Sequence, residues 1–198
     1  MSSKITRRDV LKSFTIGAAA TSVLRVIPAQ AAEYAHRMIA SEKAATPAKT
    51  YVPKFFPAHE YKTLQTICQT IIPADRDCGG AIEAGAPEFI DLLTSENQDY
   101  QLLLGGGLMW LDSTCLDRYG KNFLDGSPQQ QKEILDQIAY RKNALQDPSL
   151  NPGIEFFHFL RNMTSDGFFT SEIGIKYLGY MGNEYLQEFP GCPPVEGL

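Results

Sequence analysis

Residues 64–93 read LQTICQTIIPADRDCGGAIEAGAPEFIDLL and contain the end of one predicted helix, a turn and the start of the next helix. From Leu64 to Ile72, apolar side chains recur at intervals of three and four residues, which is the spacing of one buried helix face. Pro73 has no backbone N–H and ends that helix, and the ADRDCGG that follows it is rich in turn-forming residues. Pro87 suits the first turn of a new helix. The stretch therefore predicts two helices joined by a tight turn.

The rest of the chain repeats this helical pattern. A helix is expected over 99–119, and Ser127 with Gln130 forms a capping box at the start of another helix that continues to Leu145. The remaining predicted helices cover 154–163 and 171–180. No alternating strand pattern of useful length occurs. We therefore expect an all-α fold, a single small domain of about five or six amphipathic helices joined by short turns.

The amino terminus contains TRRDVLK at residues 6–12, which matches a bacterial twin-arginine export signal. The residues that carry this motif are Arg7, Arg8, Leu11 and Lys12. A weakly apolar stretch follows at 13–24, and it is too short to span a hydrocarbon core, which needs roughly 20 apolar residues. A twin-arginine signal directs folded proteins across the inner membrane, so we expect a periplasmic protein.

A small-x-small cleavage site, Ala29-Gln30-Ala31, comes after the apolar stretch, so we expect the mature chain to begin at Ala32. The next residues contain Ala, Lys, Thr and Pro with little periodicity, which is typical of a disordered or extended segment. The expected organisation is thus a signal peptide at 1–31, a linker at 32–57 and a helical domain at 58–198.

The charge of the chain excludes one class of partner. The full sequence has a net charge of −5, and cleavage after Ala31 leaves 13 basic and 22 acidic residues, a net charge of −9. Nucleic-acid binding relies on basic patches, so we expect no nucleic-acid partner. No later segment is apolar enough to cross a membrane, and any membrane association is expected to be indirect, through a complex.

Four cysteines lie outside the signal: Cys68, Cys78, Cys115 and Cys192. None forms a CxxC or CxxCH motif, which excludes zinc-ribbon, thioredoxin and c-type haem sites. In an oxidising periplasm disulfides are the default, and four cysteines allow three pairings that sequence alone does not distinguish. Cys68 with Cys78 would close a short loop, and Cys115 with Cys192 would tie the tail to a helix. Buried free thiols are the alternative.

No motif in the sequence predicts a catalytic, cofactor or metal site. Asp75 and Asp77 resemble the start of a calcium loop, but Gly79 and Ala86 stand where further ligands are needed. The Gly105-Gly106-Gly107 run lacks the spacing of a phosphate-binding loop and predicts a kink or a close helix crossing. The histidines form no HExxH motif, and no nucleophile has a recognisable base nearby in the sequence.

Aromatic residues are dense in the last quarter of the chain. Such residues fill cores and also anchor protein interfaces, and their density here predicts a buried surface for a protein partner. The candidate interface residues are Phe156, Phe157, Phe168, Phe169, Tyr177, Tyr180 and Tyr185.

Two blocks of sequence carry a recognisable pattern. The first block contains Ile71-Ile72-Pro73, an Asp-containing turn and Phe89-Ile90-Asp91. The second contains Gly167-Phe168-Phe169, Tyr177-Leu178-Gly179-Tyr180, Gly182-Asn183 and Gly191-Cys192. In these blocks the chain resembles a known family, subunit 3 (the small or gamma subunit) of gluconate 2-dehydrogenase-type complexes. Together the blocks cover about residues 58–193. The turn departs from the family pattern, because Cys78 and the glycines after it replace the more usual Pro-Gly.

The resemblance implies a small subunit that holds no cofactor and assists the folding, export and stability of a flavoprotein. That partner is of the glucose–methanol–choline oxidoreductase type, carries FAD and oxidises a sugar, a sugar acid or a glycoside. A cytochrome c subunit or domain with haem c receives the electrons. The alternatives that the residues leave open are a stand-alone periplasmic enzyme and a helical protein that binds a small ligand.

Overall fold

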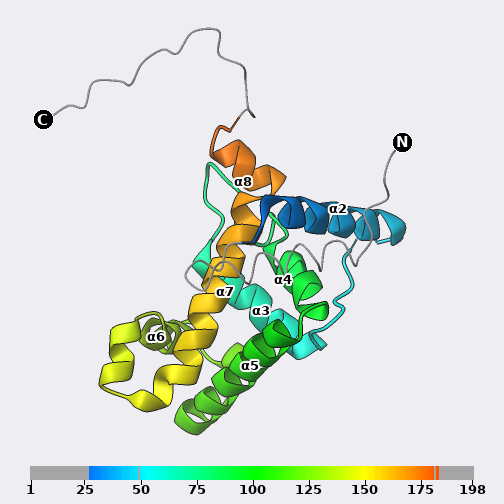
Figure 1. Ribbon diagram of the computed structural model, residues 1–198. Helices are drawn as coiled ribbons and strands as arrows, with labels where there is room; N and C mark the ends of the chain where they lie inside the picture. Colours follow the sequence, from blue (N-terminus) through cyan, green and yellow to red (C-terminus); the bar gives the residue numbers. More distant parts are fainter. Residues whose placement is uncertain (1–26, 49, 181, 183–198) are drawn as a thin grey trace, which may run out of the picture.

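The computed structural model describes residues 27–48, 50–180 and 182, and within them all regular structure is helical (Figure 1). This confirms the expected all-α fold. The α-helices are α2 (Ala29–Ala45), α3 (Ala58–Ile71), α4 (Ala86–Ser95), α5 (Gln98–Tyr119), α6 (Pro128–Ile138), α7 (Asn151–Phe169) and α8 (Glu172–Tyr177), and three short 3₁₀ helices occupy Phe123–Asp125, Arg141–Leu145 and Pro148–Leu150.

Helix α7 is the centre of the molecule, and α4 and α5 pack along it (Figure 1). Its buried side includes Phe156, Leu160 and Met163. The crossing with α5 is close, because a Cβ on Gly107 would overlap the ring of Phe156. This confirms the close helix crossing predicted from the glycine run, with Gly107 as the residue that requires it.

Side-chain caps set the starts of the surrounding helices. Ser127 Oγ accepts a hydrogen bond from the Gln130 N–H at 3.3 Å, and Gln130 Oε1 accepts one from the Ser127 N–H at 2.8 Å, so the predicted capping box is confirmed. The prediction that this helix continues to Leu145 is wrong. α6 ends at Ile138, and Leu145 is 87% exposed at the end of a 3₁₀ helix.

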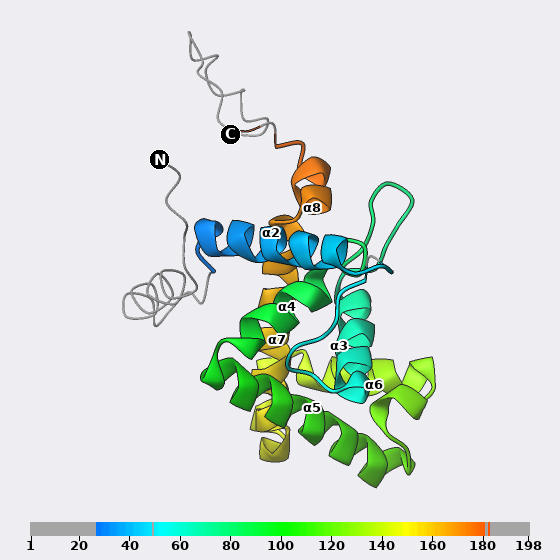
Figure 2. The same cartoon turned by 90° about the vertical axis from the view of Figure 1, so that its right-hand side faces the viewer.

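Helix α2 corrects the prediction of a disordered or extended linker at 32–57. It covers Ala29–Ala45 and lies across α4 and α7 (Figures 1 and 2). Its buried residues are Ala31, Ala32, Ala35 and Ile39. Alanine is small enough to let two helices approach closely. It contributes little to the pattern of large apolar residues from which a helix face is predicted, so the sequence did not indicate this contact face. The predicted cleavage site after Ala31 lies in the first turn of α2.

The segment between α2 and α3 is held by one buried carboxylate, that of Asp91 on α4. Its Oδ2 accepts hydrogen bonds from the Tyr51 hydroxyl at 2.8 Å and the Lys54 N–H at 2.6 Å. Its Oδ1 accepts from the N–H groups of Phe55 at 3.1 Å and Phe56 at 3.0 Å. Asp91 is fully buried. Burial and the Asp91 carboxylate raise the pKa of Tyr51, so its phenol remains the donor at any physiological pH.

We expect Asp91→Asn to lower the free energy of unfolding by about 3 kcal/mol, because the amide group would point N–H donors at the donors that the carboxylate now accepts. Tyr51→Phe, which removes one of these donors, should cost about 1 kcal/mol. Urea denaturation followed by circular dichroism measures both. The control is Asp136→Asn in α6, an exposed partner of Lys132, with an expected change under about 0.5 kcal/mol. Equal losses for Asp91→Asn and Asp136→Asn would contradict the role given to Asp91.

Candidate partner-binding groove

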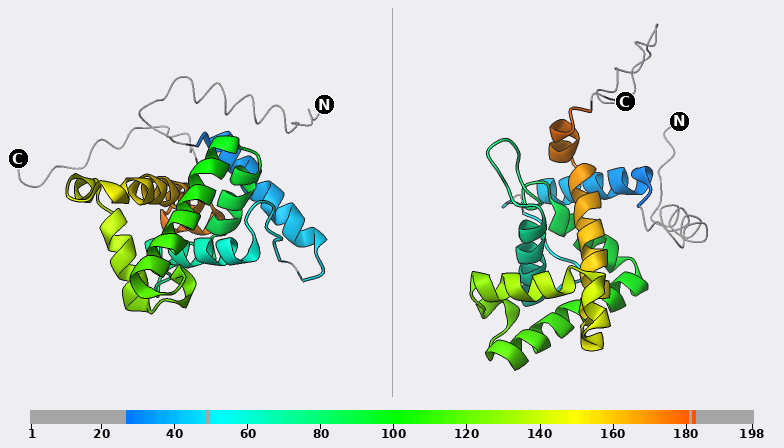
Figure 3. Two further views of the ribbon diagram at one scale, coloured as in Figure 1. Left: turned by 90° about the horizontal axis from the view of Figure 1, so that it is seen from below. Right: turned by 90° about the vertical axis from the view of Figure 1, so that its left-hand side faces the viewer.

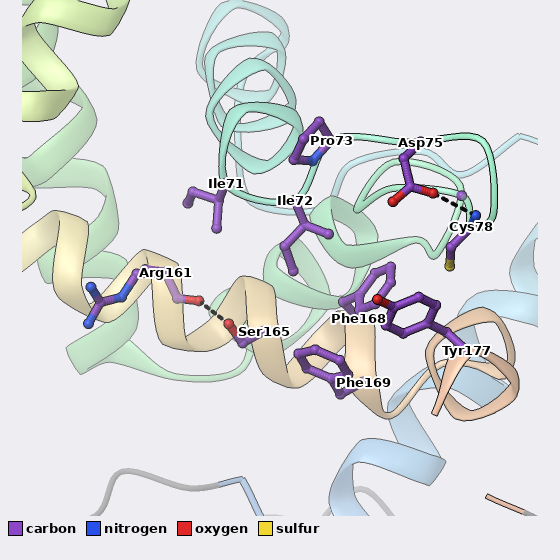
Figure 4. A pocket seen from close by; sticks show the side chains of 11 residues that line it. Ile71, Ile72, Pro73, Asp75, Cys78, Arg161, Ser165, Phe168, Phe169 and Tyr177 are labelled. Carbon is purple, nitrogen blue, oxygen red and sulfur yellow. Dashed lines mark hydrogen bonds between the residues drawn. The ribbon is translucent and has the colours of Figure 1, made fainter. Parts of the chain in front are cut away.

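A groove of about 390 Å³ lies where the end of α3 meets α8 and the end of α7 (Figure 4). Its lining comes from α3, the loop after it, α7 and α8. The residues that line it are Ile71, Ile72, Pro73, Asp75, Cys78, Gly79, Arg161, Ser165, Phe168, Phe169 and Tyr177. Both sequence blocks that resemble the subunit 3 family therefore contribute to one surface.

The loop that forms one wall of the groove is held by Asp75. Its Oδ1 accepts hydrogen bonds from the N–H groups of Asp77 at 2.9 Å and Cys78 at 2.8 Å, which is an Asx-type turn. The Asp75 N–H donates to the Cys78 carbonyl oxygen at 3.0 Å. The carboxylate of Asp75 thus stabilises the turn itself, and the described residues contain no cluster of His, Cys, Asp and Glu suited to a metal ion.

The opposite wall depends on how α8 joins α7. The Ser171 hydroxyl donates to the Phe168 carbonyl oxygen at 2.7 Å, and its oxygen accepts from the Gly174 N–H at 3.1 Å. α8 sits so close to the end of α7 that a Cβ on Gly174 would overlap the Phe168 carbonyl oxygen. These contacts place Tyr177 at the groove.

The structure separates the predicted interface residues by their exposure. Phe168 is only 3% exposed, but its side chain lines the groove. Phe156 and Phe157 are at most 7% exposed, so the prediction that they form a partner surface is wrong for these two. They lie on the faces of α7 that pack into the core. Phe169, Tyr177 and Tyr180 are exposed by 42, 57 and 56%. Tyr185 lies outside the described residues.

The cysteines are free thiols in the described part of the chain, so the predicted Cys68–Cys78 disulfide is wrong. Cys68 is fully buried on α3, with its Sγ 3.5 Å from the Thr164 hydroxyl oxygen, and burial raises its pKa to about 12. Cys78 lies at the groove, on the far side of the turn. Cys115 is a buried thiol on α5, and burial raises its pKa to about 11. Its bridge to Cys192 stays a prediction. Cys192 itself lies outside the described residues.

The groove brings no recognisable pair of catalytic groups together. Arg161 and Asp75 are its charged residues, and they come from different walls. His59 lies elsewhere, with its Nε2 2.6 Å from Asp112 Oδ2, where it links α3 to α5. The pKa of His158 is lowered by its partial burial and by Arg161 and Arg141, which favours its neutral form. Apolar and aromatic side chains dominate the lining, which is the composition of a site that binds another chain.

The comparison with protein families gives this surface its context. The family model for gluconate 2-dehydrogenase subunit 3 matches residues 58–191, which is more than half of the chain. The chain belongs to the gluconate 2-dehydrogenase subunit 3 family. Comparisons with curated proteins and with solved structures gave no significant match.

The family match starts at Ala58, the first residue of α3, and α2 lies before it. α2 is nevertheless part of the folded domain. Besides its buried alanines, Lys43 Nζ lies 2.8 Å from Glu88 Oε1 on α4. The sequence pattern does not reveal α2, because three of its four buried residues are alanines. None of the described helices is long and apolar enough to cross a bilayer.

His36 joins α2 to the helix that forms the groove. Its ring stacks on Phe89 with centroids 5.1 Å apart, and its Nε2 lies 2.9 Å from Thr170 Oγ1 at the end of α7. The Thr170 hydroxyl donates to the Asp166 carbonyl oxygen, so Nε2 is the donor in the contact with Thr170. Burial lowers the pKa of His36, which means that folding favours the neutral ring.

We therefore expect stability to fall as the pH is lowered below about 6.5, because the unfolded chain binds a proton at His36 more readily than the folded chain does. The contribution is complete above the pKa of the unfolded state, and its slope cannot exceed about 1.4 kcal/mol per pH unit. Urea denaturation at several pH values from 7.5 to 5.5 measures it. His36→Gln keeps a donor toward Thr170 and should flatten the slope, and His158 contributes a remaining slope of the same sign. An unchanged slope in His36→Gln would contradict this assignment.

Proposed function

We propose that this chain is the non-catalytic small subunit of a flavin-dependent dehydrogenase complex that oxidises a sugar, a sugar acid or a glycoside. The observation that carries the proposal is the family match over residues 58–191, which makes the chain a subunit of a dehydrogenase complex. The catalytic partner would be a flavoprotein of the glucose–methanol–choline type that carries FAD. A cytochrome c subunit or domain would accept the electrons.

The groove at the end of α7 is the surface that we assign to the flavoprotein. It combines an apolar floor with two exposed aromatic rings, Phe169 and Tyr177, and Tyr180 follows beyond α8. Aromatic side chains that stand partly exposed around a groove are typical anchors of protein interfaces. Contact there would stabilise the flavoprotein without any chemistry by the small subunit.

Export is the second part of the proposed role. The twin-arginine motif at Arg7 and Arg8 lies on a chain in which we find no motif for a cofactor. A flavoprotein that takes up FAD in the cytoplasm and binds this subunit there could cross the membrane with it already folded. The complex would then act in the periplasm, either free or bound to the membrane through its cytochrome.

The double variant Phe169→Ala with Tyr177→Ala should reduce binding of the flavoprotein, since loss of one aromatic anchor typically costs about 2 kcal/mol, or roughly 30-fold in affinity. Both rings are partly exposed, so we expect the melting temperature to change little. The measurement is the yield of flavoprotein that co-purifies with the tagged subunit from a co-expressing cell. The matched control is Tyr140→Ala, which removes a ring that is 57% exposed and lies in none of the groove walls. Equal yields for all variants would contradict the assigned surface.

Replacing both arginines by lysine, Arg7→Lys with Arg8→Lys, should keep this subunit and the flavoprotein in the cytoplasm. The change preserves the charge but removes the two guanidinium groups, whose planar geometry lysine does not reproduce. Cell fractionation with dehydrogenase activity measured against a panel of sugars checks this. Lys4→Arg is the control, because it changes a basic residue outside the pair. Flavoprotein activity in the periplasm of the double variant would contradict shared export.

A further inference from the structure

Helix α5 is apolar on two opposite faces, although only one of them packs into the domain. Its inner face is buried against α7 and includes Leu104, Leu108 and Leu111. The helix runs along the lower edge of the molecule in Figure 1, and Figure 3 (left) shows it from below. A helix that is apolar all round is normally buried all round, so the second face calls for a physical explanation.

The outer face of α5 carries a regular apolar stripe. Leu102, Met109 and Leu116 repeat at every seventh residue, and they are exposed by 77, 70 and 54%. Between them lie the small exposed residues Gly106 and Ser113. Spacings of three and four residues place all of these on one face, as in the contact seam of two packed helices.

Gly106 has no role within the described part of the chain. A Cβ at this position would have nothing within 4 Å, in contrast to the overlap at Gly107. Glycine in a helix interior lowers helix stability by about 1 kcal/mol relative to alanine. At Gly106 no close contact within the domain offsets this loss. The notch between Leu102 and Met109 instead allows a close approach by a side chain from outside.

The charges beside the stripe have one sign. The exposed carboxylates of Asp99 and Asp117 lie beside it, whereas Asp112 is paired with His59. The one basic residue of α5, Arg118 in the last turn, is hydrogen-bonded to Gln137 on α6. A second copy of α5 would place further carboxylates against these. A helix with a leucine-rich face flanked by Lys or Arg would match both the stripe and its charges.

We propose that the outer face of α5, defined by Leu102, Gly106, Met109, Ser113 and Leu116, is a docking site for a basic amphipathic helix of a partner protein. The site is separate from the groove at α8 and does not depend on the identity of the dehydrogenase. The apolar side chains of the incoming helix pack against the stripe, one of them fills the notch at Gly106, and its basic residues flank the aspartates.

The test measures binding of the full chain to a fluorescent 18-residue helical peptide of leucine and lysine. The control peptide has the same leucine positions, with glutamate in place of each lysine. We expect the lysine peptide to bind and the glutamate peptide to bind at least tenfold more weakly. Met109→Lys and Gly106→Leu should each weaken binding of the lysine peptide at least tenfold, the first by placing a charge in the stripe and the second by filling the notch. Asp99→Asn with Asp117→Asn should reduce the salt dependence of binding.

Tyr140→Lys and Leu145→Lys are the controls, because they add the same charge at exposed apolar positions outside α5. Circular dichroism confirms that each variant is folded. Equal affinity for both peptides, or equal losses for Met109→Lys and Tyr140→Lys, would overturn the proposal. A photo-cross-linking residue at position 109 of the full chain tests, without any added peptide, which molecule occupies the outer face of α5. A cross-link to the predicted signal peptide at 1–31 or to a second copy would also overturn it, because the occupant would then be this chain.

Discussion

The carboxylate of Asp91 is the contact on which the arrangement of the amino-terminal half depends. It is buried, and no lysine or arginine side chain pairs with it among the described residues; four hydrogen-bond donors satisfy it instead. Three of these are consecutive backbone N–H groups from Lys54 to Phe56, a segment that has no helix of its own to satisfy them. The same contact therefore satisfies the buried carboxylate and the backbone N–H groups of an irregular segment.

Other contacts rely on this anchor. Because the Asp91 carboxylate fixes the chain just before α3, Phe56 enters the core and α3 starts beside α4. α2, at the other end of the held segment, is then close enough for its alanines to pack and for His36 to stack on Phe89. α4 and α5 pack on α7, which carries the groove at its end. The position of the groove thus depends on contacts made far from it in sequence.

The sequence predicts helices well where capping chemistry marks them and less well where packing decides. Ser127, Gln130 and Pro87 mark helix starts that the structure confirms, because a cap acts within a few residues. α2 was missed since small residues form its contact face. The high density of aromatic residues predicted a partner surface, which stays a prediction, and it could not distinguish buried Phe168 from exposed Phe169, although the two are neighbours in the chain. The cysteine spacing failed for a similar reason: the short separation of Cys68 and Cys78 says nothing about side-chain direction, and Cys68 points toward Thr164 in the core.

The groove and the outer face of α5 differ in chemistry as well as in place. The groove lies by α8, at the opposite end of the molecule from α5 in Figure 1, and α7 with its packed core separates the two. The groove offers aromatic rings with one acidic and one basic residue, whereas the α5 face offers aliphatic side chains beside the exposed carboxylates of Asp99 and Asp117. Substitutions at two such surfaces share no partner atoms, so their effects on stability are expected to add. A partner that touches both would gain affinity from the second contact without any new chemistry at the first, because the rigid helices fix the distance between them. In the proposed function, that rigidity would be the physical basis on which this subunit holds the flavoprotein in its folded form.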